Sequence, residues 1–177
     1  MRRMLLILGL WVAMAAPSGA DEAALAKFYG QYRGKGIAES PRAESMELTS
    51  RTMDLSIRPS GNGFEVIWSA VILGDRSAVG RRADRKTSRV VFEVVEGADF
   101  YLGRGSRNPA SGAALWWARV DGRRMIVQVL QIDRAGKLDH QTYVRTLTET
   151  GLNLDYKREE EGIRVRRVRG SFKRVGD

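Results

Sequence analysis

The residues of this chain best suited to chemistry are arginines and aromatic side chains placed two positions apart. Trp117 and Arg119 share one face of an expected strand, and Tyr143 and Arg145 share one face of another, because alternate residues of a strand point the same way. An indole wall beside a guanidinium suits an apolar ligand with an acidic headgroup. A filled core with arginine side chains extending to solvent produces the same pattern. The candidate cavity residues are Tyr32, Trp68, Trp117, Arg119, Tyr143 and Arg145, and we expect Trp117, Arg119 and Tyr143 to line one internal face.

The sequence contains few residues of the types that usually act in catalysis. His140 is the only histidine, and its neighbour Asp139 points to the opposite face of an expected strand, so the two form no dyad. The chain has no cysteine and no G-x-S-x-G nucleophile motif. We therefore expect no catalytic residue, no metal site and no cofactor, and place His140 on the surface or at a cavity rim, although an enzyme is not excluded.

A basic run near the C-terminus offers a second kind of site. Between Ile163 and Val175 six cations occur without an acidic residue: Arg164, Arg166, Arg167, Arg169, Lys173 and Arg174. Alternation places Arg164 and Arg166 on one face of a strand and Arg167 and Arg169 on the other. The run predicts either a patch that binds an anionic surface or an edge strand that charge protects from pairing with other chains.

The first twenty residues predict export. Two arginines precede an apolar core from Leu5 to Ala16, and small residues follow at positions 18–20, as in a cleaved signal peptide. We therefore expect a periplasmic or secreted protein made of one domain, residues 21–177. The formal net charge is +9, or +7 without Arg2 and Arg3. In that location an anionic envelope component is a more suitable partner than nucleic acid.

Residues after the signal predict an all-β domain. A short helix is expected over 21–29, and from Gly30 onward period-2 segments alternate with turn residues. Eight or nine antiparallel strands joined by short turns would leave unpaired edges unless they close into an up-and-down barrel. A two-sheet sandwich is the alternative. A membrane-spanning barrel is not expected, since charges occupy faces of several strands. The expected strands are 29–38, 52–58, 64–72, 89–96, 114–120, 124–132, 138–148, 152–157 and 163–175, with 97–112 irregular.

The segment from Phe28 to Gly36, FYGQYRGKG, resembles the opening of a calycin (lipocalin-like) barrel. Lipocalins enter their first strand through a short helix and a G-x-W motif, and Gly30 and Tyr32 match it with tyrosine in place of tryptophan. The resemblance implies that Tyr32 closes the barrel floor beneath a basic residue from a late strand, for which Arg145 is the candidate. The central lipocalin motif T-D-Y is absent. A nitrobindin-like haem site would have His140 as its only available axial ligand.

Two functional hypotheses follow. In the first, the protein is an exported, non-enzymatic calycin-like barrel that binds a small amphiphilic or anionic ligand. In the second, the barrel is packed solid and its basic surface docks an anionic lipid, a glycan or a protein partner of the envelope. The state of the interior, open or filled, separates them.

Overall fold

The computed structural model describes residues 19–42, 45–73, 85–106 and 108–177. The predicted signal peptide lies outside the described residues, apart from Gly19 and Ala20 in the first turn of the helix. Among the described residues, no helix is long and apolar enough to cross a membrane.

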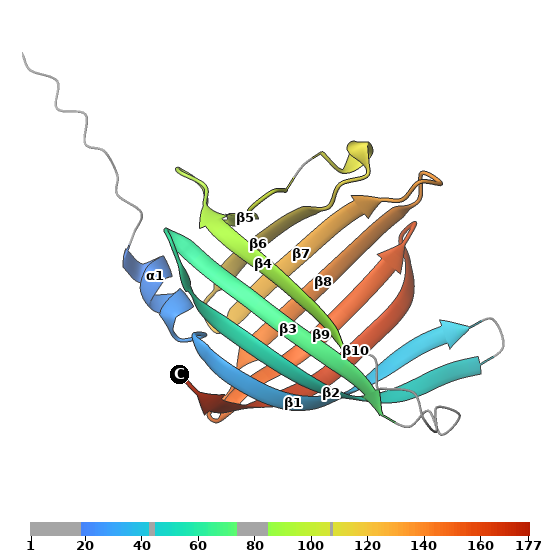
Figure 1. The fold of residues 1–177 in the computed structure, drawn as a ribbon, viewed down its shortest axis with the longest axis horizontal. Coiled ribbons are helices and arrows are strands. Elements are labelled where there is room, and N and C mark those ends of the chain that lie inside the picture. Colours follow the sequence, from blue (N-terminus) through green and yellow to red (C-terminus); the bar gives the residue numbers. More distant parts are fainter. Residues whose placement is uncertain (1–18, 43–44, 74–84, 107) are drawn as a thin grey trace, which may run out of the picture.

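Ten antiparallel strands close into one barrel in which each strand pairs with its neighbours in sequence, and β1 also pairs with β10 (Figure 1). The predicted all-β, up-and-down barrel with a short N-terminal helix is therefore confirmed. The predicted count of eight or nine strands is wrong, because three residues of the segment expected to be irregular form β5. The elements are α1 (Gly19–Ala26), β1 (Gly30–Arg42), β2 (Ser45–Ser60), β3 (Gly63–Leu73), β4 (Lys86–Val94), β5 (Tyr101–Gly103), η2 (Pro109–Ser111), β6 (Leu115–Asp121), β7 (Arg124–Ile132), β8 (Leu138–Leu147), β9 (Gly151–Glu160) and β10 (Ile163–Gly176).

Alternation along the strands sorts side chains between the interior and the outer surface. On β7, Met125, Val127 and Val129 are at most 3% exposed, whereas Ile126 and Gln128 between them are partly exposed. The same period places Met53, Leu55 and Ile57 of β2 inside, as the sequence predicted. The buried interior contains the side chains Phe64, Val66, Phe92, Ala118, Leu152, Val168 and Phe172 as well.

Helix α1 lies at one end of the barrel, which is also the end where the chain terminates (Figure 1). We call this the α1 end and the opposite one the far end. Leu25 and Phe28 are buried with the barrel core, and the Tyr32 hydroxyl donates a hydrogen bond to the Phe28 carbonyl at 2.8 Å. The cation above the Tyr32 ring is Arg174, 5.1 Å from its centroid. The choice of Arg145 for this position is thus wrong, because its strand β8 does not adjoin β1, whereas β10 does.

A bulge in β10 changes which cations share a face. Its pairing with β9 shifts between Arg164 and Arg166, so Arg164 pairs with Glu159 and Arg166 pairs with Arg158, two neighbours that face opposite sides of β9. Arg164 therefore faces outward and Arg166 inward. The prediction that they share one face is wrong because strict alternation does not survive the extra residue.

Candidate functional site

The barrel interior is divided into a filled half and a polar half. Toward the α1 end the inward side chains are aromatic and aliphatic, and Phe28, Phe64 and Phe92 have no exposed surface. Toward the far end, inward aromatic side chains such as Trp68 and Tyr143 remain partly exposed although they face the barrel axis. Water therefore reaches the interior on that side. Ten strands also enclose a wider interior than the predicted eight or nine.

Arg145 lies at the boundary between these halves. Its strand neighbours are Met125, which is fully buried, and Leu154, which is partly exposed. The guanidinium carbon of Arg145 lies 5.9 Å from the Trp68 ring and 5.3 Å from the Tyr143 ring. Cation–π contacts of this kind partly offset the loss of water around the charge.

The charge of Arg145 has no acidic partner among the described residues. The residue is 3% exposed, and its Nη1 atom is buried without a hydrogen-bond partner. Burial lowers the pKa of Arg145 to about 10, which leaves the group charged at neutral pH. A buried charge without an ion-pair partner is unfavourable, so an anion that reached this nitrogen would find an unsatisfied donor.

The two tyrosines beside Arg145 are held by a hydrogen-bond chain. Gln141 Oε1 accepts from Tyr143 at 3.2 Å and from Tyr156 at 3.0 Å, while the Gln141 amide nitrogen donates to Asp139. Arg158 pairs with the same Asp139 at 3.0 Å and with Glu160 at 2.9 Å. Burial is the main cause that raises the pKa of Tyr143 and of Tyr156, so both hydroxyls stay neutral donors. Asp139 and Glu160 are thus paired with Arg158, and no carboxylate of the described residues pairs with Arg145.

Two further arginines face the interior, Arg51 on β2 and Arg166 on β10. The Arg51 Nε atom is buried without a hydrogen-bond partner, and Arg166 contacts Ser40 at 3.4 Å. Burial, and then the positive charge of Arg166, hold the pKa of Arg51 below its ordinary value. Within the described part of the chain neither side chain forms an ion pair with a carboxylate. The polar half of the interior is consequently electropositive.

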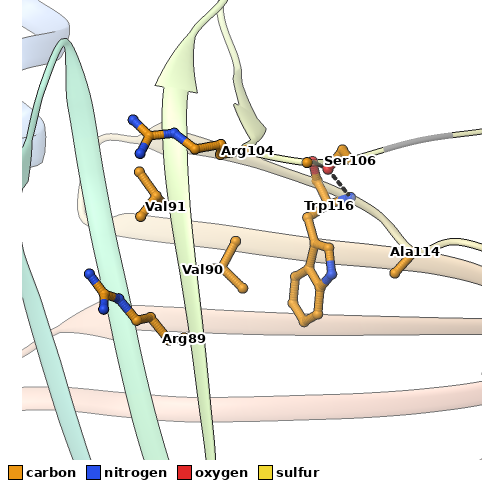
Figure 2. A pocket seen from close by; sticks show the side chains of 8 residues that line it. Arg89, Val90, Val91, Arg104, Ser106, Ala114 and Trp116 are labelled. Atoms are coloured by element: carbon orange, nitrogen blue, oxygen red, sulfur yellow. Dashed lines mark hydrogen bonds between the residues drawn. The ribbon is translucent and has the colours of Figure 1, made fainter.

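The barrel wall has a lateral gap beside this interior. Because β5 has only three residues, β4 pairs with it from Phe92 to Val94, and the β4 edge before Val91 has no described strand partner on that side. A cavity of about 390 Å³ occupies the gap. Figure 2 shows that the Val90 and Trp116 side chains lie on one side of it, with Arg89 and Arg104 at its outer margin. The Ser106 hydroxyl bonds both backbone groups of Trp116, at 2.9 and 3.2 Å, and so replaces a strand partner there.

The gap is connected to Arg145 through two tryptophans. Trp116 lies 5.9 Å from Trp68, measured between ring centroids, and Trp68 is the ring above which Arg145 lies. Trp116, which the sequence analysis did not select, is therefore the inward member of the Trp116–Trp117 pair. Its alternation with Ala118 and Val120, apolar where Arg119 and Asp121 are charged, is the signal that could have identified it.

Trp117 and Arg119 do not join the interior site. They pair with Gln128 and Ile126, the outward positions of β7, and Trp117 stacks on His140 of the outer surface with ring centroids 6.1 Å apart. The expectation that they share an internal face with Tyr143 is wrong. Tryptophan and arginine occur on either face of a strand, so these residue types alone did not determine which set of alternate β6 residues points inward. Both residues line a groove of about 590 Å³ on the outer surface, together with Phe100, Leu102, Leu115 and Ile126.

Of the six candidate cavity residues, the structure brings together Trp68, Tyr143 and Arg145, and leaves Tyr32 at the floor.

The basic run of β10 does not form one patch. Arg167 pairs with Asp155 at 2.5 Å, and Arg169 with Glu39 at 3.5 Å. Arg174 donates to the carbonyl oxygens of Tyr29 and Lys27 at 2.5 and 2.8 Å. Arg166 faces the interior, which leaves Arg164 and Lys173 as outward cations of the run without an ion pair among the described residues.

His140 lies on the outer surface, 3.7 Å from Glu159. Among the described residues, no three histidine, cysteine, aspartate or glutamate side chains gather as metal ligands would. Compared with known proteins, the chain matches no family, and no curated protein matches it either. The functional argument therefore rests on the interior itself.

Proposed function

We propose that this protein is an exported, non-enzymatic calycin-like barrel that binds a small amphiphile by its anionic headgroup. The observation that carries the proposal is the buried Arg145 guanidinium, whose Nη1 atom has no hydrogen-bond partner and whose charge has no carboxylate partner in the described part of the chain. A guanidinium donates two parallel hydrogen bonds to a carboxylate or a phosphate. The location rests on the first twenty residues, and the calycin relationship on the FYGQYRGKG segment and the short helix before β1.

The aromatic walls around Arg145 support an amphiphile over a small inorganic anion. Trp68, Tyr143 and Trp116 present rings toward the interior while keeping part of their surface accessible to water. Apolar surface of this kind gains free energy when a ligand covers it. Ligand pockets typically combine such walls with a few placed polar groups.

The test is calorimetric titration of the purified protein with dodecanoate, dodecyl phosphate and dodecan-1-ol. Replacing Arg145 by methionine removes the charge and keeps most of the side-chain volume. Arg145→Met should weaken dodecanoate or dodecyl phosphate about 10- to 100-fold, the value of a charge-assisted hydrogen bond, and leave dodecan-1-ol unchanged. Arg33→Met, on the outer surface where Arg33 pairs with Asp54 at 3.3 Å, is the matched control.

The comparison of the three probes also separates the headgroup classes. Preference for dodecanoate would identify a carboxylate site, and preference for dodecyl phosphate a phosphate site. If none of the probes binds, or if Arg145→Met leaves both anions bound as tightly as before, the proposal is refuted. The packed barrel that docks partners on its outer surface would then be the better description.

A further inference from the structure

A ligand held at Arg145 has few directions in which an apolar tail can extend. The α1 end is closed by side chains with no exposed surface, among them Phe64, Phe92 and Met125. The far end is occupied by the ion pairs of Arg158 with Asp139 and Glu160. Placing an alkyl chain against those groups would remove water from charges without replacing its hydrogen bonds. The remaining apolar path leads sideways.

Aromatic contacts connect Arg145 to the gap in the barrel wall. From the Arg145 guanidinium the path follows the Trp68 ring at 5.9 Å and then the Trp116 ring, a further 5.9 Å away. Trp116 and Val90 border the 390 Å³ cavity in the gap between β4 and β6. Figure 2 shows the Val90 side chain extending from β4 toward the Trp116 indole. Ala114 borders the same cavity with a methyl group alone, which leaves room beside the indole.

We infer that the ligand of this site is a long, single-chain anionic amphiphile whose headgroup binds Arg145 and whose tail lies along Trp68 and Trp116 into the β4–β6 gap. This inference rests on the proposed function and adds the length and path of the ligand. A short-chain acid would reach Arg145 and Trp68 only. A long-chain acid would also fill the gap, and its affinity would depend on residues there.

The experiment compares octanoate with hexadecanoate by titration calorimetry. Ala114→Trp fills the gap and should weaken hexadecanoate at least 10-fold, because several methylene groups lose their contact surface, while octanoate changes less than 2-fold. Ala110→Trp is the matched control, since Ala110 is exposed in η2 and does not border the cavity. It should change neither affinity.

A second measurement covers the case in which Ala114→Trp fails to fold. The chain has no cysteine, so Ala114→Cys can be labelled there alone with the fluorophore acrylodan. Hexadecanoate should shift its emission to shorter wavelength, and saturating octanoate should not. An unshifted emission, or equal loss of both acids in Ala114→Trp, would overturn the tail path. The headgroup site has a separate test. If the native protein and Arg145→Met bind octanoate equally well, the headgroup does not bind Arg145.

Discussion

Arg174 lies over the Tyr32 ring at 5.1 Å and at the same time donates to the Lys27 carbonyl, which follows α1. One side chain of the last strand thus fastens the helix to the floor of the barrel. Because the charged donor bonds two carbonyl oxygens, Arg174→Met should lower the free energy of unfolding by about 2 kcal/mol. Lys173→Met, an outward neighbour, should change it by less than about 0.5 kcal/mol. Urea unfolding followed by circular dichroism measures both, and equal effects would contradict the fastening role.

The ion pairs of Glu65 on the outer wall of the barrel should make the stability of the protein depend on acid pH. It is 2% exposed and bonds Arg58 and Arg89 from the neighbouring strands. Burial alone would raise the pKa of Glu65, but the hydrogen bonds and charges of the two arginines outweigh it and leave the pKa below its ordinary value of 4.5. A lowered folded-state pKa contributes stability above pH 4.5, and the contribution disappears as the pH falls through the folded-state pKa.

Glu65→Gln should therefore destabilise the protein by about 1–3 kcal/mol at pH 7 and by progressively less as the pH falls below 4.5. Unfolding curves of the two proteins measured across this range should converge at acid pH. Glu93→Gln is the control, because Glu93 forms a similar pair with Arg104 but is 42% exposed. A gap between the native and Glu65→Gln curves that stays constant with pH would refute this account.

Glycines where β1 meets β10 make a prediction about packing. A Cβ atom on Gly34 would lie 2.4 Å from the Ser171 carbonyl oxygen and 2.7 Å from the Phe172 ring. Neither neighbour has room to move, since Phe172 is buried in the core and the carbonyl belongs to the strand ladder. Gly34→Ala should cost about 2–3 kcal/mol in thermal or urea unfolding. Gly176→Ala, whose Cβ would approach no atom closer than 3.8 Å, should be tolerated.

The sequence predicted the strands wherever apolar and polar residues alternate strictly. Thr52 to Arg58 is such a segment, and its Met53, Leu55 and Ile57 face inward as expected. Strand β5 was not predicted because three residues are too few to show an alternation of apolar and polar side chains. The shortness of β5 also creates the lateral gap in the barrel wall, so the sequence pattern could not predict this part of the candidate site.

The side-chain partners were less predictable than the strands. Tyr143, Arg145 and Trp68 were candidate cavity residues, and their contact spans β3 and β8, which are distant in the sequence. The position of Arg174 above Tyr32 depends on how the barrel closes, which no local pattern encodes. Arg51 and Arg158 also went unselected because an arginine on a strand usually extends to solvent.

Binding of an anion at Arg145 should depend on pH in one direction. The pKa of Arg145 is about 10, whereas burial raises the pKa of the neighbouring Tyr143 well above its ordinary 10.0, so Arg145 loses its charge before Tyr143 gains one. Dodecanoate affinity should be constant from pH 6 to about 9 and then fall as the pH passes 10. Dodecan-1-ol affinity should remain constant throughout. A parallel loss of both probes would indicate unfolding at alkaline pH instead of loss of the charge.

Arg145 should also cost stability in the ligand-free protein. Its guanidinium is removed from water with one nitrogen unsatisfied, and contacts with Trp68 and Tyr143 return only part of that free energy. Methionine at this position keeps the contact with the rings and carries no charge, so Arg145→Met should raise the free energy of unfolding by about 1–2 kcal/mol. At the same concentration, dodecanoate should stabilise the native protein more than the variant, because stabilisation by a ligand of the folded state grows with its affinity. Differential scanning fluorimetry with and without dodecanoate measures both effects. If Arg145→Met instead destabilises the ligand-free barrel, the arginine serves the fold, and the case for an anion site at this position fails.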